Sequence, residues 1–152
     1  MTTVSILPAT PADLADLATL ITEMEAFYSE DEPTEDAARN TEHALFGAIP
    51  YAHALLARMD NRLAGFASYS FLWPAQGTTG SLYLKELYVR SDDRRLGIGR
   101  QLMDELSKIA ALRQCSRIEW TTDTENTGTQ QFYADLGHRP HAGKLLYRID
   151  LA

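Results

Sequence analysis

The sequence lacks the features that mark secreted and membrane-spanning chains. It contains a single cysteine, Cys115, so no internal disulfide can form, and a lone thiol fits a reducing compartment. The N-terminus shows no basic and apolar leader, and no apolar run approaches the roughly 20 residues that cross a bilayer. We therefore expect a cytoplasmic protein without a membrane partner.

Motifs of several large enzyme classes are missing as well. No Gly-x-x-x-x-Gly-Lys-Ser/Thr string occurs, which excludes a Walker A loop, and no Gly-x-Ser-x-Gly string occurs, which argues against a hydrolase. The histidines form no metal-ligand pattern, since His138 and His141 only flank Pro140 in an expected loop. We expect no metal site.

Basic residues are fewer than acidic ones. The formal net charge is -7 and the pI is about 5.0, so we expect no nucleic-acid partner, because tight binding there neutralises many phosphates. Basic residues gather at positions 94, 95 and 100. One acidic stretch suits a cationic substrate, or is only a solvated helix face and loop. Its members are Glu23, Glu25, Glu30, Asp31, Glu32, Glu35 and Asp36.

Hydrophobic periodicity predicts one α/β domain over residues 1–152, because strands come first and then alternate with helices around a mixed sheet. Thr10 and Thr34 are expected N-caps, Pro33 follows the first helix, and Gly137 ends the last helix. The predicted strands cover residues 4–7, 53–58, 63–71, 81–89, 117–122 and 144–149. The predicted helices cover residues 11–28, 35–46, 98–109 and 127–136.

The segment after the fourth predicted strand carries the clearest functional signal. It reads Arg-Arg-Leu-Gly-Ile-Gly-Arg from Arg94 to Arg100 and opens an amphipathic helix. Glycines let a ligand approach the backbone, and the N–H groups of a helix N-terminus favour anionic oxygens. A dinucleotide fingerprint is excluded, because Leu102 stands where a third small residue is needed. The segment predicts a pyrophosphate site.

The pattern Arg94-x-x-Gly97-x-Gly99 resembles the Gln/Arg-x-x-Gly-x-Gly/Ala signature of the GNAT superfamily of acyl-CoA-dependent N-acyltransferases. Similar strings at residues 6–13 and 126–137 extend the likeness over nearly the whole chain. The loop at 71–74 is similar to that of spermidine/spermine and thialysine N-acetyltransferases. Arg95 departs from the glycine that is frequent in this family.

The resemblance implies a GNAT-like fold with a mostly antiparallel mixed sheet, and acetyl-CoA as co-substrate. It implies a β-bulge near Leu87 and a strand-like contact between the pantetheine arm and residues 87–89. Asn126 would hydrogen-bond that arm, unless it is only a helix N-cap. The cofactor-binding residues are then Leu87, Tyr88, Val89, Arg94, Arg95, Leu96, Gly97, Ile98, Gly99, Arg100 and Asn126.

Acetyl transfer to an amine needs a base, because an alkylamine of pKa near 10 is protonated at neutral pH. We predict Glu86 as base through water, with a solvent-exposed strand glutamate as the alternative. Related polyamine enzymes have acids at the positions of Lys85 and Glu86, and simple alternation sends these two side chains to opposite faces. The resemblance makes Tyr133 the general acid for the leaving thiolate, or else an amphipathic tyrosine between core and surface.

Phe27 and Tyr28, together with Lys85, are the predicted acceptor-binding residues, although the spacing of Tyr28 also fits the core. The expected acceptor is a small primary amine such as a polyamine, diamine or amino acid. A protein lysine or N-terminus is an alternative acceptor. A non-catalytic acyl-CoA sensor is an alternative function. Resemblance also implies a homodimer.

Overall fold

The computed structural model describes residues 3–29 and 35–151. The chain forms two compact units, Met1–Trp120 and Thr121–Ala152, called here the first and the second part. The predicted single domain over residues 1–152 stays a prediction. Some predicted features lie outside the described residues, namely the cap Thr34, Pro33 and the acids Glu30, Asp31 and Glu32.

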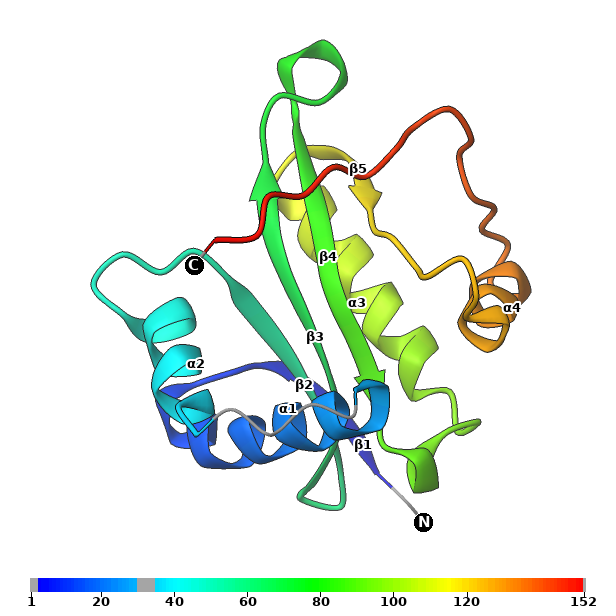
Figure 1. Ribbon diagram of the computed structural model, residues 1–152. Helices are drawn as coiled ribbons and strands as arrows, with labels where there is room; N and C mark the ends of the chain where they lie inside the picture. The colour runs from blue at the N-terminus through cyan, green and yellow to red at the C-terminus, as the bar shows by residue number, and fades with distance from the viewer. Residues whose placement is uncertain (1–2, 30–34, 152) are drawn as a thin grey trace. The chain divides into compact units, whose positions relative to one another are not determined.

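The first part is built on a five-stranded sheet of order β1-β2-β3-β4-β5. The strands are β1 (Val4–Pro8), β2 (His53–Met59), β3 (Arg62–Leu72), β4 (Gly80–Val89) and β5 (Cys115–Glu119). The first three pairings are antiparallel and the last is parallel, which confirms the predicted mixed sheet (Figure 1). Only β5 is displaced, because it begins and ends before the predicted 117–122.

A two-residue turn joins β2 to β3. Asp60 and Asn61 have φ angles of 49° and 72°, which these residue types tolerate better than most others. A turn with positive φ at both central positions matches the twist of the strands that it joins. The turn therefore fixes the β2–β3 register, in which Met59 faces Arg62.

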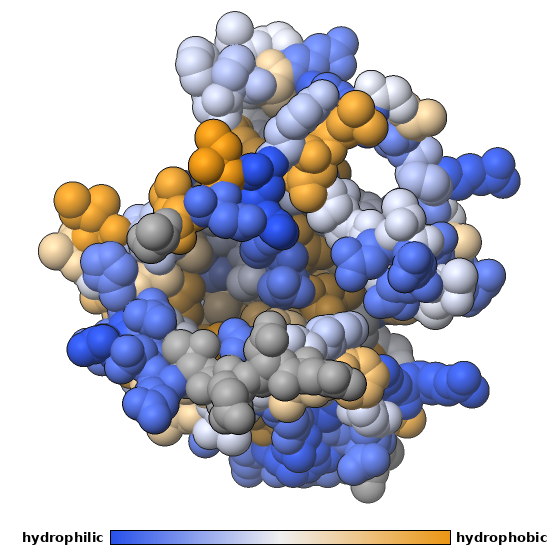
Figure 2. All heavy atoms as spheres, in the orientation of Figure 1, coloured by the Kyte–Doolittle hydropathy of each residue, from blue (hydrophilic) through white to orange (hydrophobic). Residues whose placement is uncertain are grey.

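Helix α1 (Leu14–Tyr28) packs on one face of the sheet. Its apolar stripe joins residues of β2, β3 and β4 in one buried cluster: Leu17, Leu20, Met24, Ala54, Leu56, Leu63, Phe66 and Tyr88. Helix α2 (Ala37–Phe46) contacts α1 and β2. Figure 2 shows hydrophobic atoms gathered at the loop between α2 and β2, at the left edge, where Ile49 is 83% exposed.

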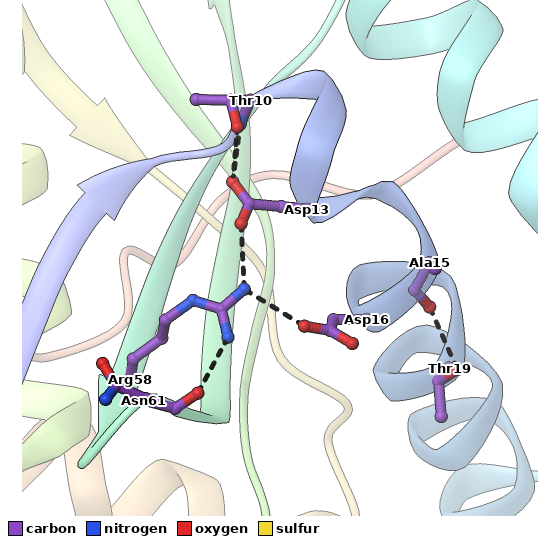
Figure 3. Close-up of polar contacts among 7 residues, drawn as sticks. All are labelled: Thr10, Asp13, Ala15, Asp16, Thr19, Arg58 and Asn61. Atoms are coloured by element: carbon purple, nitrogen blue, oxygen red, sulfur yellow. Dashed lines mark hydrogen bonds and ion pairs between the residues drawn. The ribbon is translucent and has the colours of Figure 1, made fainter.

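The start of α1 is tied to β2 by a polar network (Figure 3). Thr10 donates from its backbone N–H and its hydroxyl to Asp13 at 2.8 and 3.0 Å. Asp13 in turn pairs with Arg58 at 2.9 Å, and Asp16 lies 3.3 Å from the same guanidinium. Hydrogen bonds first from Thr10 and then from Arg58 hold the pKa of Asp13 below its usual value.

Helix α3 (Ile98–Leu112) covers the other face of the sheet. Side chains alternate along a strand, so Leu55 and Ala57 point away from the face that carries Leu56. Ile98, Leu102 and Leu106 of α3 are almost fully buried there. The sheet thus has an apolar layer on both faces.

The second part contains helix α4 (Thr127–Asp135), as predicted. Asn126 caps it by accepting a hydrogen bond from the Thr129 N–H at 3.1 Å, and Gly137 with φ 92° follows its end. The strand predicted over 144–149 is wrong, because the described residues 138–151 form no helix or strand. A strand needs a neighbour for its backbone hydrogen bonds, and side-chain pattern does not reveal whether one is available.

Candidate active site

Strand β4 contains a β-bulge at Lys85. Ser68 of β3 faces Glu86 and the next residue, Tyr69, faces Leu84, so Lys85 is one residue too many in the ladder. The bulge lies within two residues of Leu87, where the resemblance implied it. Lys85 is exposed at this irregular point.

The bulge decides which face carries Glu86. Tyr88 pairs with Phe66, and both belong to the buried cluster under α1. Glu86 is two residues before Tyr88, so it shares the α1 face of the sheet. Leu84 pairs with Tyr69 across the bulge and lies on the opposite face. Simple alternation would have placed Leu84 and Glu86 together.

Beyond the bulge, β4 presents a row of backbone groups on one edge. The parallel pairing with β5 ends at Tyr83 and Glu119, and the described residues of Met1–Trp120 place no strand beside β4 after it. On the other edge, the Arg90 N–H donates to Ala64 at 2.8 Å. Because N–H directions alternate in an antiparallel ladder, Leu87 and Val89 point theirs away from β3. An extended ligand can add there as a further strand.

The loop between β4 and α3 has an unusual backbone. Arg95 and Gly97 have φ angles of 64° and 83°, both in the left-handed region. Gly97 is the N-cap of α3, and no side-chain hydrogen bond caps this end. The next residue, Ile98, is 1% exposed and anchors the helix. The first N–H groups of α3 therefore have no carbonyl one turn earlier, which suits an anion.

The Arg94 side chain is exposed but folds back onto the protein. Its Nε donates to the Val89 carbonyl at 2.9 Å, and its guanidinium carbon lies 4.8 Å from the centre of the Phe27 ring and 5.7 Å from that of Tyr88. The side chain thus joins the loop, the end of β4 and the end of α1. Arg95 and Arg100 are exposed.

Phe27, Tyr28 and Tyr88 form an aromatic cluster on the same face as Glu86. The ring centres of Phe27 and Tyr28 are 5.0 Å apart, and those of Tyr28 and Tyr88 are 6.3 Å apart. Tyr28 is 53% exposed, so it belongs to the surface rather than to the core. Burial, and then the charge of Glu23, raise the pKa of Tyr88.

Arg62 and Asp93, which no sequence motif marks, border the loop. Arg62 donates to both carboxylate oxygens of Asp93, each at 2.7 Å. These bonds lower the pKa of Asp93, although burial opposes the shift. The only sequence feature that points to Asp93 is its position shortly before Arg94. Asp92 shares this feature, which therefore does not distinguish the two acids.

Asn126 and Tyr133 belong to the second part, and their predicted roles stay predictions. The amide oxygen of Asn126 is the helix cap described above, and the Tyr133 ring lies 5.0 Å from that of Phe132. Among the described residues, no three His, Cys, Asp or Glu side chains are placed to hold a metal ion. The same residues contain no helix that is long and apolar enough to cross a membrane.

Comparison with known proteins gives these features a context. Residues 17–138 match the family described as Acetyltransferase (GNAT) family. Thialysine N-epsilon-acetyltransferase from Sus scrofa is 26% identical over 151 residues, which is 91% of this chain and 86% of that protein.

Two solved structures share the fold. An integron cassette protein from the mobile metagenome of V. cholerae superposes with a TM-score of 0.86 and 29% identity, covering 97% of this chain and 92% of the other. An aminoglycoside N-acetyltransferase in complex with CoA gives a TM-score of 0.82 at 18% identity, with 99% and 97% coverage. At that identity the second likeness concerns the fold alone.

Proposed function

Because the chain belongs to the acetyltransferase (GNAT) family, we propose that it moves an acetyl group from acetyl-CoA directly to a primary amine of a small molecule, within a ternary complex. That it is an N-acetyltransferase follows from the family and from its relatives. The observation that carries the proposal is the juxtaposition in one strand–loop–helix unit of an open backbone edge, a bulge and an uncapped helix N-terminus.

The residues of this unit fit coenzyme A. Ile98, Gly99 and Arg100 offer backbone N–H groups to the pyrophosphate, and the exposed cations Arg95 and Arg100 add charge. The outward N–H groups of Leu87 and Val89 suit the amides of a pantetheine arm. A backbone N–H beside the bulge would stabilise the negative charge that develops on the thioester oxygen.

Glu86 takes the proton of the acceptor in this proposal. It lies on the α1 face beside the aromatic cluster, so a water between Glu86 and the acceptor would carry the proton away. The neutral amine nitrogen then bonds to the acetyl carbon while the carbon–sulfur bond breaks, and the extra proton left on that nitrogen passes through water to replace the one that Tyr133 gives up. Tyr133 supplies a proton to the departing thiolate, since a phenol of pKa near 10 is protonated at neutral pH.

We propose a polyamine, diamine or amino-acid-like acceptor bound near Phe27 and Tyr28. The net charge of -7 favours a cationic partner, and half-exposed aromatic rings suit an ammonium group. Lys85, which is exposed at the bulge, would contact the acceptor, and its positive charge would help to select which acceptors bind. We further propose a cytoplasmic homodimer without nucleic-acid or membrane partners, a state that sedimentation would test.

The test measures thiol release from acetyl-CoA with spermidine, diamines, thialysine, amino acids and basic peptides. Turnover with one small-amine class, lowered about 100-fold by Glu86→Gln and by Tyr133→Phe, would support the proposal. Faster turnover of peptides than of small amines would instead favour a protein lysine or N-terminus as the acceptor. Acetyl-CoA binding without any transfer would favour a sensor.

A further inference from the structure

Asp93 is the one charged side chain that is buried among the described residues, with 4% of its surface exposed. It ends the short helical turn Ser91–Asp93, whose N–H at Asp93 donates to the Arg90 carbonyl at 2.9 Å. The next residue, Arg94, opens the loop that leads into α3. A buried carboxylate needs a partner that offsets its lost hydration.

Arg62, the first residue of β3, is that partner. Both of its terminal nitrogens donate to Asp93 at 2.7 Å, the two-pronged geometry that gives such pairs direction as well as strength. The Arg62 side chain is half exposed and lines a cavity of about 400 Å³ between α1 and the β2–β3 hairpin. The pair therefore lies where β3 begins, beside the β2–β3 turn.

The position of this pair matters because the loop after it is conformationally costly. Arg95 holds a positive φ angle, which is costly for a residue with a Cβ atom and which an unrestrained chain would leave. One end of the loop is fixed by Ile98, which is buried in the core. At the other end, the Asp93 carboxylate is held by the β2–β3 hairpin through Arg62.

We propose that Arg62 and Asp93 are positioning residues for the cofactor: their ion pair holds the loop from Arg94 to Gly99 in the conformation that presents backbone N–H groups to a pyrophosphate. This inference rests on the proposed function, because it assumes acetyl-CoA binds at the start of α3. Neither residue touches the cofactor. Each acts through the backbone, so that preorganised N–H groups need no rearrangement on binding.

A pair elsewhere on the same hairpin provides a matched control. Arg58 of β2 binds Asp13 at 2.9 Å, and both side chains are less than a quarter exposed. That pair ties the hairpin to the start of α1 rather than to the loop. Breaking it should lower the melting temperature without changing affinity for acetyl-CoA.

The experiment measures acetyl-CoA binding by calorimetry, well below each melting temperature, for Asp93→Asn, Arg62→Gln, the double variant and Asp13→Asn. We expect each single variant at the loop to weaken binding about 10-fold, and the double variant to lose no more than either. The expected kcat at saturating acetyl-CoA stays near that of the wild type while KM rises. Asp13→Asn should stay within about twofold. Unchanged affinity in Asp93→Asn, with a melting temperature lowered as in Asp13→Asn, would overturn the inference.

A second variant keeps the test decisive if Asp93→Asn does not fold. In Arg62→Ala, the space left by the Arg62 guanidinium should admit a guanidinium ion that pairs with Asp93, so low concentrations of guanidinium chloride should restore part of the affinity that equal sodium chloride does not. Equal effects of the two salts would contradict a positioning role for this pair. If the wild type itself binds no acetyl-CoA, the proposed function fails instead.

Discussion

At the scale of single residues, Arg95 departs from the local backbone preference of its residue type. Its φ of 64° lies in the left-handed region, where glycine is favoured because a Cβ atom crowds the backbone. Acetyltransferases that resemble this chain often have glycine there. We propose that the charge of this strained arginine contributes to the proposed phosphate site.

Replacing Arg95 by glycine should therefore stabilise the fold and weaken cofactor binding together. We expect about 0.5–1 kcal/mol of added stability, because strain of about 1–2 kcal/mol is relieved while the unfolded chain gains freedom. Urea unfolding and the KM for acetyl-CoA measure the two effects. Arg95→Ala is the control, since it removes the charge but keeps Cβ. If the two variants were equally stable, the positive φ angle of Arg95 would not be the cause of the added stability.

Residue-scale prediction from sequence succeeds where function depends on neighbours in the chain. Gly97 and the cations around it were identified because they follow one another between a strand and a helix. Arg62 and Asp93 were not, because they are 31 positions apart and no local pattern joins them. Their pairing is a product of the fold.

At the scale of elements, β4 shows the limit of alternation. Its span and its place between a loop and the glycine segment were predicted almost to the residue. The side that Glu86 faces was not predictable, because one inserted residue reverses the alternation and nothing in the sequence Leu-Lys-Glu-Leu marks it. The resemblance supplied the bulge, and the register located it at Lys85.

The approach of β3 to β4 yields a second prediction. A Cβ atom at Gly65 would lie 2.6 Å from the Tyr88 carbonyl, so Gly65→Ala must push the strands apart. We expect a loss of about 2 kcal/mol in urea unfolding and weaker acetyl-CoA binding, since the open edge of β4 moves. Gly128→Ala in α4 is the control, because its Cβ meets nothing closer than 3.9 Å and helix propensity should raise stability. Normal stability of Gly65→Ala would contradict the close packing of these strands.

The far ends of β2 and β3 carry a third prediction, which concerns pH. His53 stacks on Tyr69 with ring centres 5.2 Å apart, and Arg113 lies over Phe71, which also contacts His53. Burial, and then the charge of Arg113, lower the pKa of His53 below its usual 6.5. The unfolded chain thus takes up this proton first, so the stability from neutral His53 is complete above pH 6.5 and declines as pH falls toward the lowered value.

His53→Gln should remove this decline. We expect the difference in melting temperature between the wild type and the variant to shrink steadily as the buffer moves from neutral pH to about pH 5. Thermal unfolding at matched ionic strength measures it. A difference that is constant over this range would show that His53 does not titrate differently on folding.

At the scale of the whole molecule, the order and the type of the helices and strands were easier to predict than which predicted strands join the sheet. The alternation of strands and helices gave the mixed sheet, because each amphipathic segment needs a partner layer. The segment 144–149 has the apolar content of a strand yet none of its pairing. Pairing partners far apart in the sequence leave no mark on the segment itself, so this part of the fold required the structure.

The overall charge supplies the last prediction, which separates classes of acceptor. A protein of net charge -7 attracts cations from solution. Salt weakens this attraction, because at 0.1 M ionic strength it screens charges that are more than about 10 Å apart. If the acceptor is a diamine or polyamine, kcat/KM should fall steeply as sodium chloride rises, and less steeply for a monoamine of equal length. The KM for anionic acetyl-CoA should also rise, because salt weakens its contacts with Arg95 and Arg100, so the acceptor is varied at saturating acetyl-CoA. Equal salt dependence for the diamine and the monoamine would mean that the protein's negative charge does not attract the second ammonium group. That result would favour an amino-acid-like acceptor whose carboxylate contacts Lys85.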